Sequence, residues 1–121
     1  MSRFVHFLEQ LRSYGPQLCM EGNGASYTYA ELLEEFECWR LRFDEANIAV
    51  GTVIGLRADY SLAAVGALLA LFARGAIAAL IPRDRNITDY LVDAHAVALL
   101  ELTSRAVTRG VLYRIRRVIH C

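Results

Sequence analysis

The sequence contains no lysine, and this absence limits the chemistry that the chain can carry. All 13 of its basic residues are arginines, and 13 acidic residues balance them, so that the formal net charge is zero. A chain without excess charge has no overall field to attract nucleic acid or an anionic membrane. A phosphate-binding loop of the glycine-rich, lysine-ending type is excluded as well.

Cysteines and uninterrupted hydrophobic runs are also scarce. Cys19, Cys38 and Cys121 lie far apart in the sequence, which argues against a disulfide framework or a zinc site. The apolar stretch 62–81 is interrupted by Arg74-Gly75, which argues against a membrane span. Because the N-terminus lacks the hydrophobic block of a signal peptide, we expect a cytoplasmic protein.

Apolar residues, by contrast, are abundant. They make up 55% of the chain, against roughly 45–50% in an ordinary soluble domain. A length of 121 residues is sufficient for one domain or for part of one. Length and composition therefore fit a single domain, or part of one, that is more apolar than usual.

The stretch Val53–Pro82 organises the chain and predicts a strand–helix–strand unit. Apolar runs at 53–58 and 76–81 predict the two strands. The residues between them predict a helix over 62–73. It ends at Arg74-Gly75, because a cation suits the last turn and glycine tolerates positive φ. A crossover of this length joins parallel strands.

The helix of this unit is apolar on two faces. One face carries bulky side chains and the other small ones: Leu62, Val65, Leu69 and Phe72 against Ala63, Gly66, Ala67 and Ala70. A helix that is apolar all round is buried on more than one side. We therefore expect this helix to form a layer inside something larger than the chain itself.

The N-terminal part predicts a helix, a hairpin and a second helix. The first helix covers about 3–14, and the hairpin covers 17–27 with its turn at Gly22-Asn23-Gly24. Thr28 and Glu31 then match a capping box, which starts a helix that extends to about Ala46. Helical spacing predicts its buried stripe as Leu32, Phe36, Trp39 and Phe43.

Some polar groups invite a functional interpretation, and in each case the pattern favours a structural one. The glutamates of 34–37 lie early in a helix, where the helix dipole favours carboxylates. The glycines of 22–24 fit a turn and lead into no lysine-bearing helix. The alternating polar residues of 84–88 lack the glycine and the final acidic residue of a calcium loop. We therefore assign no catalytic, cofactor-binding or metal-binding residue in this chain.

The C-terminal part predicts a short helix over 87–94, a buried strand over 96–100 and a basic tail over 103–121. Apolar residues at helical spacing predict a short amphipathic helix within the tail: Val111, Ile115 and Val118. A basic helix can bind nucleic acid or anionic lipid. Because Tyr113 is the one aromatic residue available for stacking, the pattern favours a solvated terminal helix.

Several of these segments together resemble the adenylate-forming ligases. This superfamily includes acyl- and aryl-CoA synthetases, fatty acyl-AMP ligases, luciferases and the adenylation domains of nonribosomal peptide synthetases. The matching segments are Thr28–Leu32, Gly51–Ile54, Ala67–Ala70 and Arg74–Ala76, and the spacing from Thr28 to Gly75 follows the family's without a gap. Pro16 and Leu18 resemble the strand before the helix start, and Pro82 and Asp84 resemble the family's proline and aspartate after the second strand.

The resemblance covers about residues 14–102 and includes departures from the pattern. Asn47 stands where the family usually has glycine, and Thr52 where it usually has aspartate. Pro82 comes about two residues later than usual, and Arg85 replaces a frequent proline. These departures blur the subfamily and leave the implied fold unchanged.

The resemblance implies an α/β fold with a partly parallel sheet flanked by helices, like the N-terminal subdomain of these ligases. We expect an incomplete subdomain over 1–102, followed by the basic tail 103–121. The implied activity is ATP-dependent activation of a carboxylate to an acyl- or aminoacyl-adenylate, followed by transfer to coenzyme A or a carrier protein.

The same family places its catalytic apparatus further along than this chain reaches. Adenylation needs a Ser/Thr/Gly-rich loop with a lysine to hold pyrophosphate, acidic residues for ribose and Mg²⁺, and a lysine from a mobile C-terminal lobe. The segment Thr103–Gly110 faintly resembles the loop, but it has one glycine and no lysine. ATP, Mg²⁺, coenzyme A and a carrier protein are therefore implied for a complete parent ligase, and no cofactor is implied for this chain.

Three hypotheses follow, and the weakest is a membrane-associated fragment that binds anionic lipid through the basic tail. The first is a truncated or excised N-terminal piece of an adenylate-forming ligase that cannot adenylate alone. The alternative is a stand-alone interaction module that self-associates or pairs with a larger ligase, because a lone small domain could hardly cover a helix that is apolar on both faces.

Overall fold

The computed structural model describes residues 2–22, 24–58, 61–82, 86, 89, 96–104 and 111–117. The N-terminal elements are α1 (Ser2–Tyr14), β1 (Leu18–Gly22), β2 (Ala25–Thr28) and α2 (Tyr29–Glu45). The following elements are β3 (Val53–Arg57), α3 (Leu62–Ala73), β4 (Ile77–Leu80), β5 (Ala98–Ser104) and β6 (Val111–Arg117).

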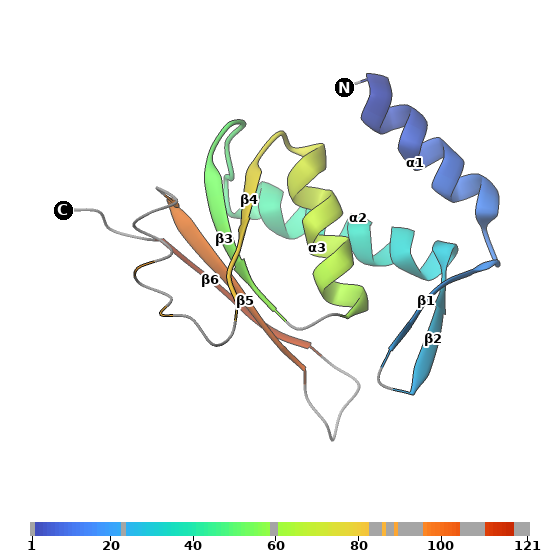
Figure 1. The fold of residues 1–121 in the computed structure, drawn as a ribbon. Coiled ribbons are helices and arrows are strands. Elements are labelled where there is room, and N and C mark those ends of the chain that lie inside the picture. Colours follow the sequence, from blue (N-terminus) through green and yellow to red (C-terminus); the bar gives the residue numbers. More distant parts are fainter. Residues whose placement is uncertain are drawn as a thin grey trace.

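The described strands form a two-stranded hairpin and a four-stranded mixed sheet. Strands β1 and β2 make the antiparallel hairpin, and the larger sheet has the order β4-β3-β5-β6. Strand β3 is parallel to both of its neighbours, and β6 runs antiparallel to β5. Helices α2 and α3 lie on the same side of this sheet, and α1 lies beyond α2 (Figure 1). The α/β fold with a partly parallel sheet and the β3–α3–β4 crossover are therefore confirmed.

The core lies between the two helices and the sheet. The predicted stripe of α2 is buried throughout: Leu32, Phe36, Trp39 and Phe43. Alternate residues of the central strands, such as Ile54 and Leu100, meet this stripe and α3. No polar or charged side chain among the described residues is buried, so the core is held by apolar packing.

Both helices that cover the sheet begin at side-chain caps. The Thr28 Oγ1 atom accepts from the Glu31 amide at 3.2 Å, and the Glu31 carboxylate accepts from the Thr28 amide at 3.1 Å. This reciprocal arrangement is the predicted capping box. Ser61 caps α3 by accepting from the Ala64 amide at 3.1 Å.

The helix predicted in the basic tail is wrong over 111–117, where the chain forms β6. Val111, Tyr113 and Ile115 also alternate with period two, and β-branched and aromatic residues favour strands. Strand β5 offers an edge along its whole length, and the two strands pair from Ala98↔Arg117 to Ser104↔Val111. The sheet thus continues past residue 102, where the tail was expected to begin. The helix predicted over 87–94 lies, apart from Asp89, outside the described residues.

Helix α3 buries its two apolar faces to different extents. The small residues Ala63, Gly66, Ala67 and Ala70 are buried. The bulky residues Leu62, Val65 and Leu69 are half-buried, and Phe72 at the C-terminal end of the helix is 47% exposed. We expected α3 to be buried on more than one side. The structure buries the small face completely and the bulky face only in part. None of the helices in the described part of the chain is long and apolar enough to cross a membrane.

Candidate functional surface

The glutamates of α2 take part in structural contacts. The Trp39 indole donates to the Glu35 Oε1 atom at 2.9 Å, which fixes that carboxylate on the helix. Arg40 donates to Glu37 through two nitrogens at 2.9 and 3.0 Å. This hydrogen bond and the charge of Glu37, with a smaller contribution from Asp44, raise the pKa of the Arg40 guanidinium. Glu35 and Glu37 are thus engaged within the helix. Glu37 and Glu34 also line a pocket of about 650 Å³ between α1 and α2, together with Arg12.

The described residues do not assemble a metal centre. No group of three or more His, Cys, Asp or Glu side chains comes together among them. Of the polar residues at 84–88, Asn86 is described, and its Oδ1 atom accepts from the Asp89 amide at 3.3 Å, as a helix cap does. Cys38 is exposed, and burial raises the pKa of the Cys19 thiol, which disfavours its thiolate.

Helices α2 and α3 end in the same backbone motif. At the end of α2 the Ile48 amide donates to the Phe43 carbonyl, and Asn47 takes a positive φ of 57°. At the end of α3 the Ala76 amide donates to the Leu71 carbonyl, and Gly75 has a φ of 73°. These six-residue loops are Schellman motifs, which satisfy carbonyls that the helix leaves unpaired.

Arg74 joins these two helix ends. Its guanidinium donates to the Ile48 carbonyl through Nε at 2.9 Å and Nη2 at 2.7 Å, and its Nη1 atom pairs with Asp44. The Gly51 amide donates to the Gly75 carbonyl at 2.8 Å beside this contact. The Arg74-Gly75 pair, which carries part of the family resemblance, therefore fastens α3 to the loop before β3.

The contact between the helix bodies depends on Gly66. A Cβ atom at this position would lie 2.6 Å from the Glu35 Cγ atom and 3.0 Å from its Cβ atom. Real Cβ atoms do not approach that closely, so a larger residue would push the helices apart. The small-residue face of α3 is thus a fitted surface against α2.

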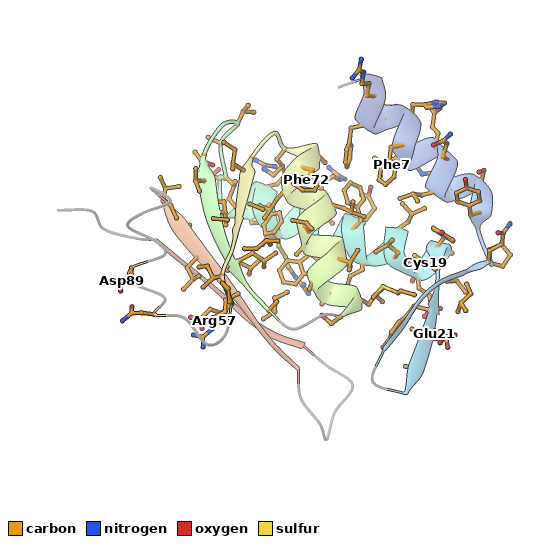
Figure 2. The ribbon with its side chains drawn as sticks, viewed as in Figure 1. Phe7, Cys19, Glu21, Arg57, Phe72 and Asp89 are labelled. Carbon is orange, nitrogen blue, oxygen red and sulfur yellow. The ribbon has the colours of Figure 1, made fainter. Side chains whose placement is uncertain are left out.

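The carboxyl ends of the parallel strands carry one charged pair in the described part of the chain. Ligands of open α/β sheets bind beyond these strand ends. Arg57 ends β3 and is aligned with Glu101 on β5, and both residues are half-buried. Arg57 lies on the side of the sheet away from α2 and α3 (Figure 2). Opposite charges on neighbouring strands favour their pairing, so a structural role accounts for these residues.

An open apolar surface lies along β4. This strand is an edge of the four-stranded sheet, and Ile77 and Leu80 expose 54% and 60% of their surface. Leu80 also lines a pocket of about 320 Å³ with Val65 and Leu68 of α3. Together with Phe72, which follows Leu68 by one helical turn, Leu80, Val65 and Leu68 form what we call the β4 surface, on the side of the sheet that faces α3. Ile77 points to the opposite side of the sheet. An apolar surface of this kind suits another polypeptide, because it offers no polar group to orient a small charged substrate.

Comparison with known proteins shows which solved structures share this fold. No protein-family profile matches the sequence, and no curated protein sequence matches it. Solved structures of nonribosomal peptide synthetase adenylation proteins do match in three dimensions. NpsA of Klebsiella oxytoca, in complex with 3-hydroxyanthranilyl-AMSN, superposes with a TM-score of 0.75 at 17% identity over 88% of this chain and 23% of its own.

Two further structures agree. The N-terminal subdomain of Klebsiella oxytoca NpsA, in complex with anthranilyl-AMSN, gives a TM-score of 0.73 at 17% identity over 79% of this chain and 26% of its own. A four-domain nonribosomal peptide synthetase bound to AMP and glycine gives 0.72 at 20% identity over 83% and 8%. The chain thus spans about a quarter of the solved subdomain. The likeness confirms the fold that the sequence resemblance implied: the chain has the architecture of part of an adenylation-domain N-terminal subdomain.

Proposed function

We propose that this chain is the N-terminal part of a carboxylate-activating, adenylate-forming ligase and that its 121 residues do not adenylate alone. The observation that carries the proposal is the fold likeness over 79–88% of the chain to NpsA structures. The residues that suggested the family from the sequence agree with it. Thr28 and Glu31 cap α2, and Arg74 and Gly75 close α3 onto the loop before β3.

The chemistry of adenylation supports the second half of the proposal. Holding ATP and the departing pyrophosphate requires backbone amides of a glycine-rich loop and a cation that meets the phosphate charge. The chain has no lysine and a single glycine within 103–110. Thr103 and Ser104, which begin the loop-like segment, belong to β5 and pair with β6. ATP and Mg²⁺ would therefore be held by residues that a complete ligase adds to this chain.

ATP–pyrophosphate exchange tests this proposal directly. The purified chain is assayed with aromatic, aliphatic and amino carboxylates, with Klebsiella oxytoca NpsA as the positive control. We expect no carboxylate-dependent exchange above the blank for the chain alone. Exchange that depends on a particular carboxylate would overturn the proposal, because it would require a nucleotide site within these 121 residues.

The size of the native polypeptide provides an independent test. An antibody against this region should detect, in cells that express the protein, a band several times larger than the 13.5 kDa of the chain. Such a band would place the chain within a longer ligase. A band at 13.5 kDa would contradict the ligase assignment and would direct attention to the chain's own surfaces.

A further inference from the structure

The two edges of the four-stranded sheet differ in how they are protected. Free sheet edges tend to pair with other chains, and proteins discourage this with charged residues on the edge strand. Strand β6 contains Arg114, Arg116 and Arg117 among its seven residues. Strand β4 is Ile-Ala-Ala-Leu and contains no charged residue. The β6 sequence therefore disfavours edge pairing, whereas the β4 sequence permits it.

The hydrogen bonds of β4 show which of its backbone groups face outward. The Ile77 amide donates to the Thr52 carbonyl at 2.8 Å, and the Ile81 amide donates to the Leu56 carbonyl at 2.9 Å. Backbone groups of a strand alternate in direction from one residue to the next. The N–H and C=O groups of Ala78 and Leu80 consequently point away from β3, at the open edge.

We propose that a second copy of this chain pairs with β4, antiparallel and about a two-fold axis, so that the two sheets become continuous. Outward-facing groups must oppose one another in such a pair, which limits the register. Setting Ala78 opposite Leu80 of the other copy aligns all four outward-facing residues and forms four backbone hydrogen bonds, with Ala79 on the axis. This register also places a small side chain beside each exposed Leu80.

The neighbouring registers are less favourable. Setting Leu80 opposite itself would align Ala78 with Pro82, which has no N–H to donate. Setting Ala78 opposite itself would align Leu80 with Ala76, which lies outside the strand. The sequence of β4 is thus complementary to itself in one register, as an isologous contact requires.

The β4 surface extends the contact beyond the four-residue strand. A strand pair of this length alone falls short of the roughly 1,200 Å² that a small stable interface buries. A two-fold axis perpendicular to the sheet keeps both copies of α3 on the same face, one on each side of the new strand pair. Val65, Leu68 and the exposed Phe72 then flank the seam, and the pocket that Val65 and Leu68 form with Leu80 receives apolar side chains of the other copy.

Charge does not oppose this association. The segment from Gly75 to Pro82 has no charged residue, and the net charge of the chain is zero. The nearest preceding charge, on Arg74, is engaged by Asp44 and the Ile48 carbonyl of the same chain. The paired residues Ala78, Ala79 and Leu80 of the two copies therefore bring no like charges opposite one another.

Sedimentation equilibrium over a range of concentrations tests the proposal with the full chain. We expect a concentration-dependent species of twice the 13.5 kDa monomer mass. The Ala78→Pro variant removes an outward N–H and leaves the bonds to β3 in place, so it should weaken the dimer about tenfold or more by removing two of its four hydrogen bonds. Leu80→Lys should weaken it comparably by placing a charge in the seam.

A matched control separates this effect from a general change of surface. Leu41 on α2 is 55% exposed, close to the exposure of Leu80, and lies outside the β4 surface. Leu41→Lys should leave the dimer intact. Circular dichroism and thermal unfolding of each variant verify that the monomer is folded. A wild-type chain that stays monomeric at all concentrations would overturn the proposal and leave the edge to a strand of a different polypeptide. A dimer that survives both Ala78→Pro and Leu80→Lys would overturn it equally.

Discussion

The two faces of α3 are both apolar, yet they are fitted to different degrees. The small-residue face packs so closely on α2 that Gly66 has no room for a Cβ atom beside Glu35. The bulky face is half-buried and ends in Phe72, which exposes nearly half of its surface. Because large side chains gain more from burial than small ones, the face with more to gain is the one left open.

This difference shows that the apolar composition of a helix face does not by itself indicate how completely that face is buried. Small residues let two helix backbones approach closely, and the contact that results is tight and specific. Bulky residues on the opposite face provide stability when something covers them. Within this chain the interlocked face joins α3 to α2, and the open face is the one that the proposed remainder of a ligase, or the proposed second copy, would cover.

Adjacent residues on the two sides of α3 provide the sharpest test of this contrast. Leu71 is fully buried and Phe72 is 47% exposed. We expect Leu71→Ala to lower the free energy of unfolding by about 3 kcal/mol, because it opens a cavity in the core. Phe72→Ala should lower it by less than about 1 kcal/mol, since much of that side chain already contacts water. Urea unfolding at low protein concentration measures both. An equal loss for the two variants would show that the bulky face is covered as completely as the core.

The helix contact itself is tested by adding volume to it. Gly66→Val should lower the free energy of unfolding by about 2–3 kcal/mol, because the new side chain meets the Glu35 side chain and the adjoining backbone. Ala64→Val is the matched control, because it adds the same residue type where α3 lines the pocket beside β4. The control should change stability by less than about 1 kcal/mol. If both variants unfold at the same urea concentration, the contact at Gly66 is not tight.

Much of this fold follows from local sequence signals. The capping box at Thr28, the buried stripe of α2 and the β3–α3–β4 crossover each depend on residues close together in sequence, so their spacing predicts them. The tail was mispredicted because 111–117 fits both periods. The spacing of its arginines and apolar residues is compatible with an amphipathic helix. Pairing with the edge of β5 favours the strand, and this pairing is a tertiary contact that the local sequence does not reveal.

The contacts that join the elements had no comparable signal. Arg74 was interpreted as a cation suited to the end of α3, and its hydrogen bonds to Ile48 cross 26 residues. Gly66 was interpreted as one of several small residues, and nothing near it in sequence indicates Glu35 as its neighbour. The open edge of β4 depends on strand order, which spacing along the chain does not specify. The absence of an assigned catalytic residue stays a prediction, which the exchange assay tests.

The contacts of Arg74 with the Ile48 carbonyl and Asp44, which we call the joint between the ends of α2 and α3, can be tested one at a time. Arg74→Ala should lower the free energy of unfolding by about 2 kcal/mol, because the Ile48 carbonyl loses a charged donor at a partly buried position. Asp44→Asn removes the charge of the half-exposed partner and should lower the free energy by less than about 1 kcal/mol. Guanidinium unfolding of the two variants distinguishes the carbonyl contact from the ion pair. If Asp44→Asn costs as much as Arg74→Ala, the ion pair is the main bond of the joint.

Gly75 tests whether the backbone beside the joint is packed as tightly as the helix contact. Gly75 and Gly24 have similar positive φ values of 73° and 76°, so alanine should strain the backbone about equally at both, by roughly 1 kcal/mol. A Cβ atom at Gly75 would also lie 3.1 Å from the Val50 Cγ1 atom, whereas none lies within 4 Å at Gly24. We therefore expect Gly75→Ala to be the more destabilising by a few tenths of a kcal/mol, and adding Val50→Ala should remove the excess. Thermal unfolding of these variants measures the difference. Equal losses at Gly75 and Gly24 would mean that the loop around Val50 moves to accommodate the new Cβ atom. The close packing seen between α2 and α3 would then not extend to the contact between Gly75 and Val50.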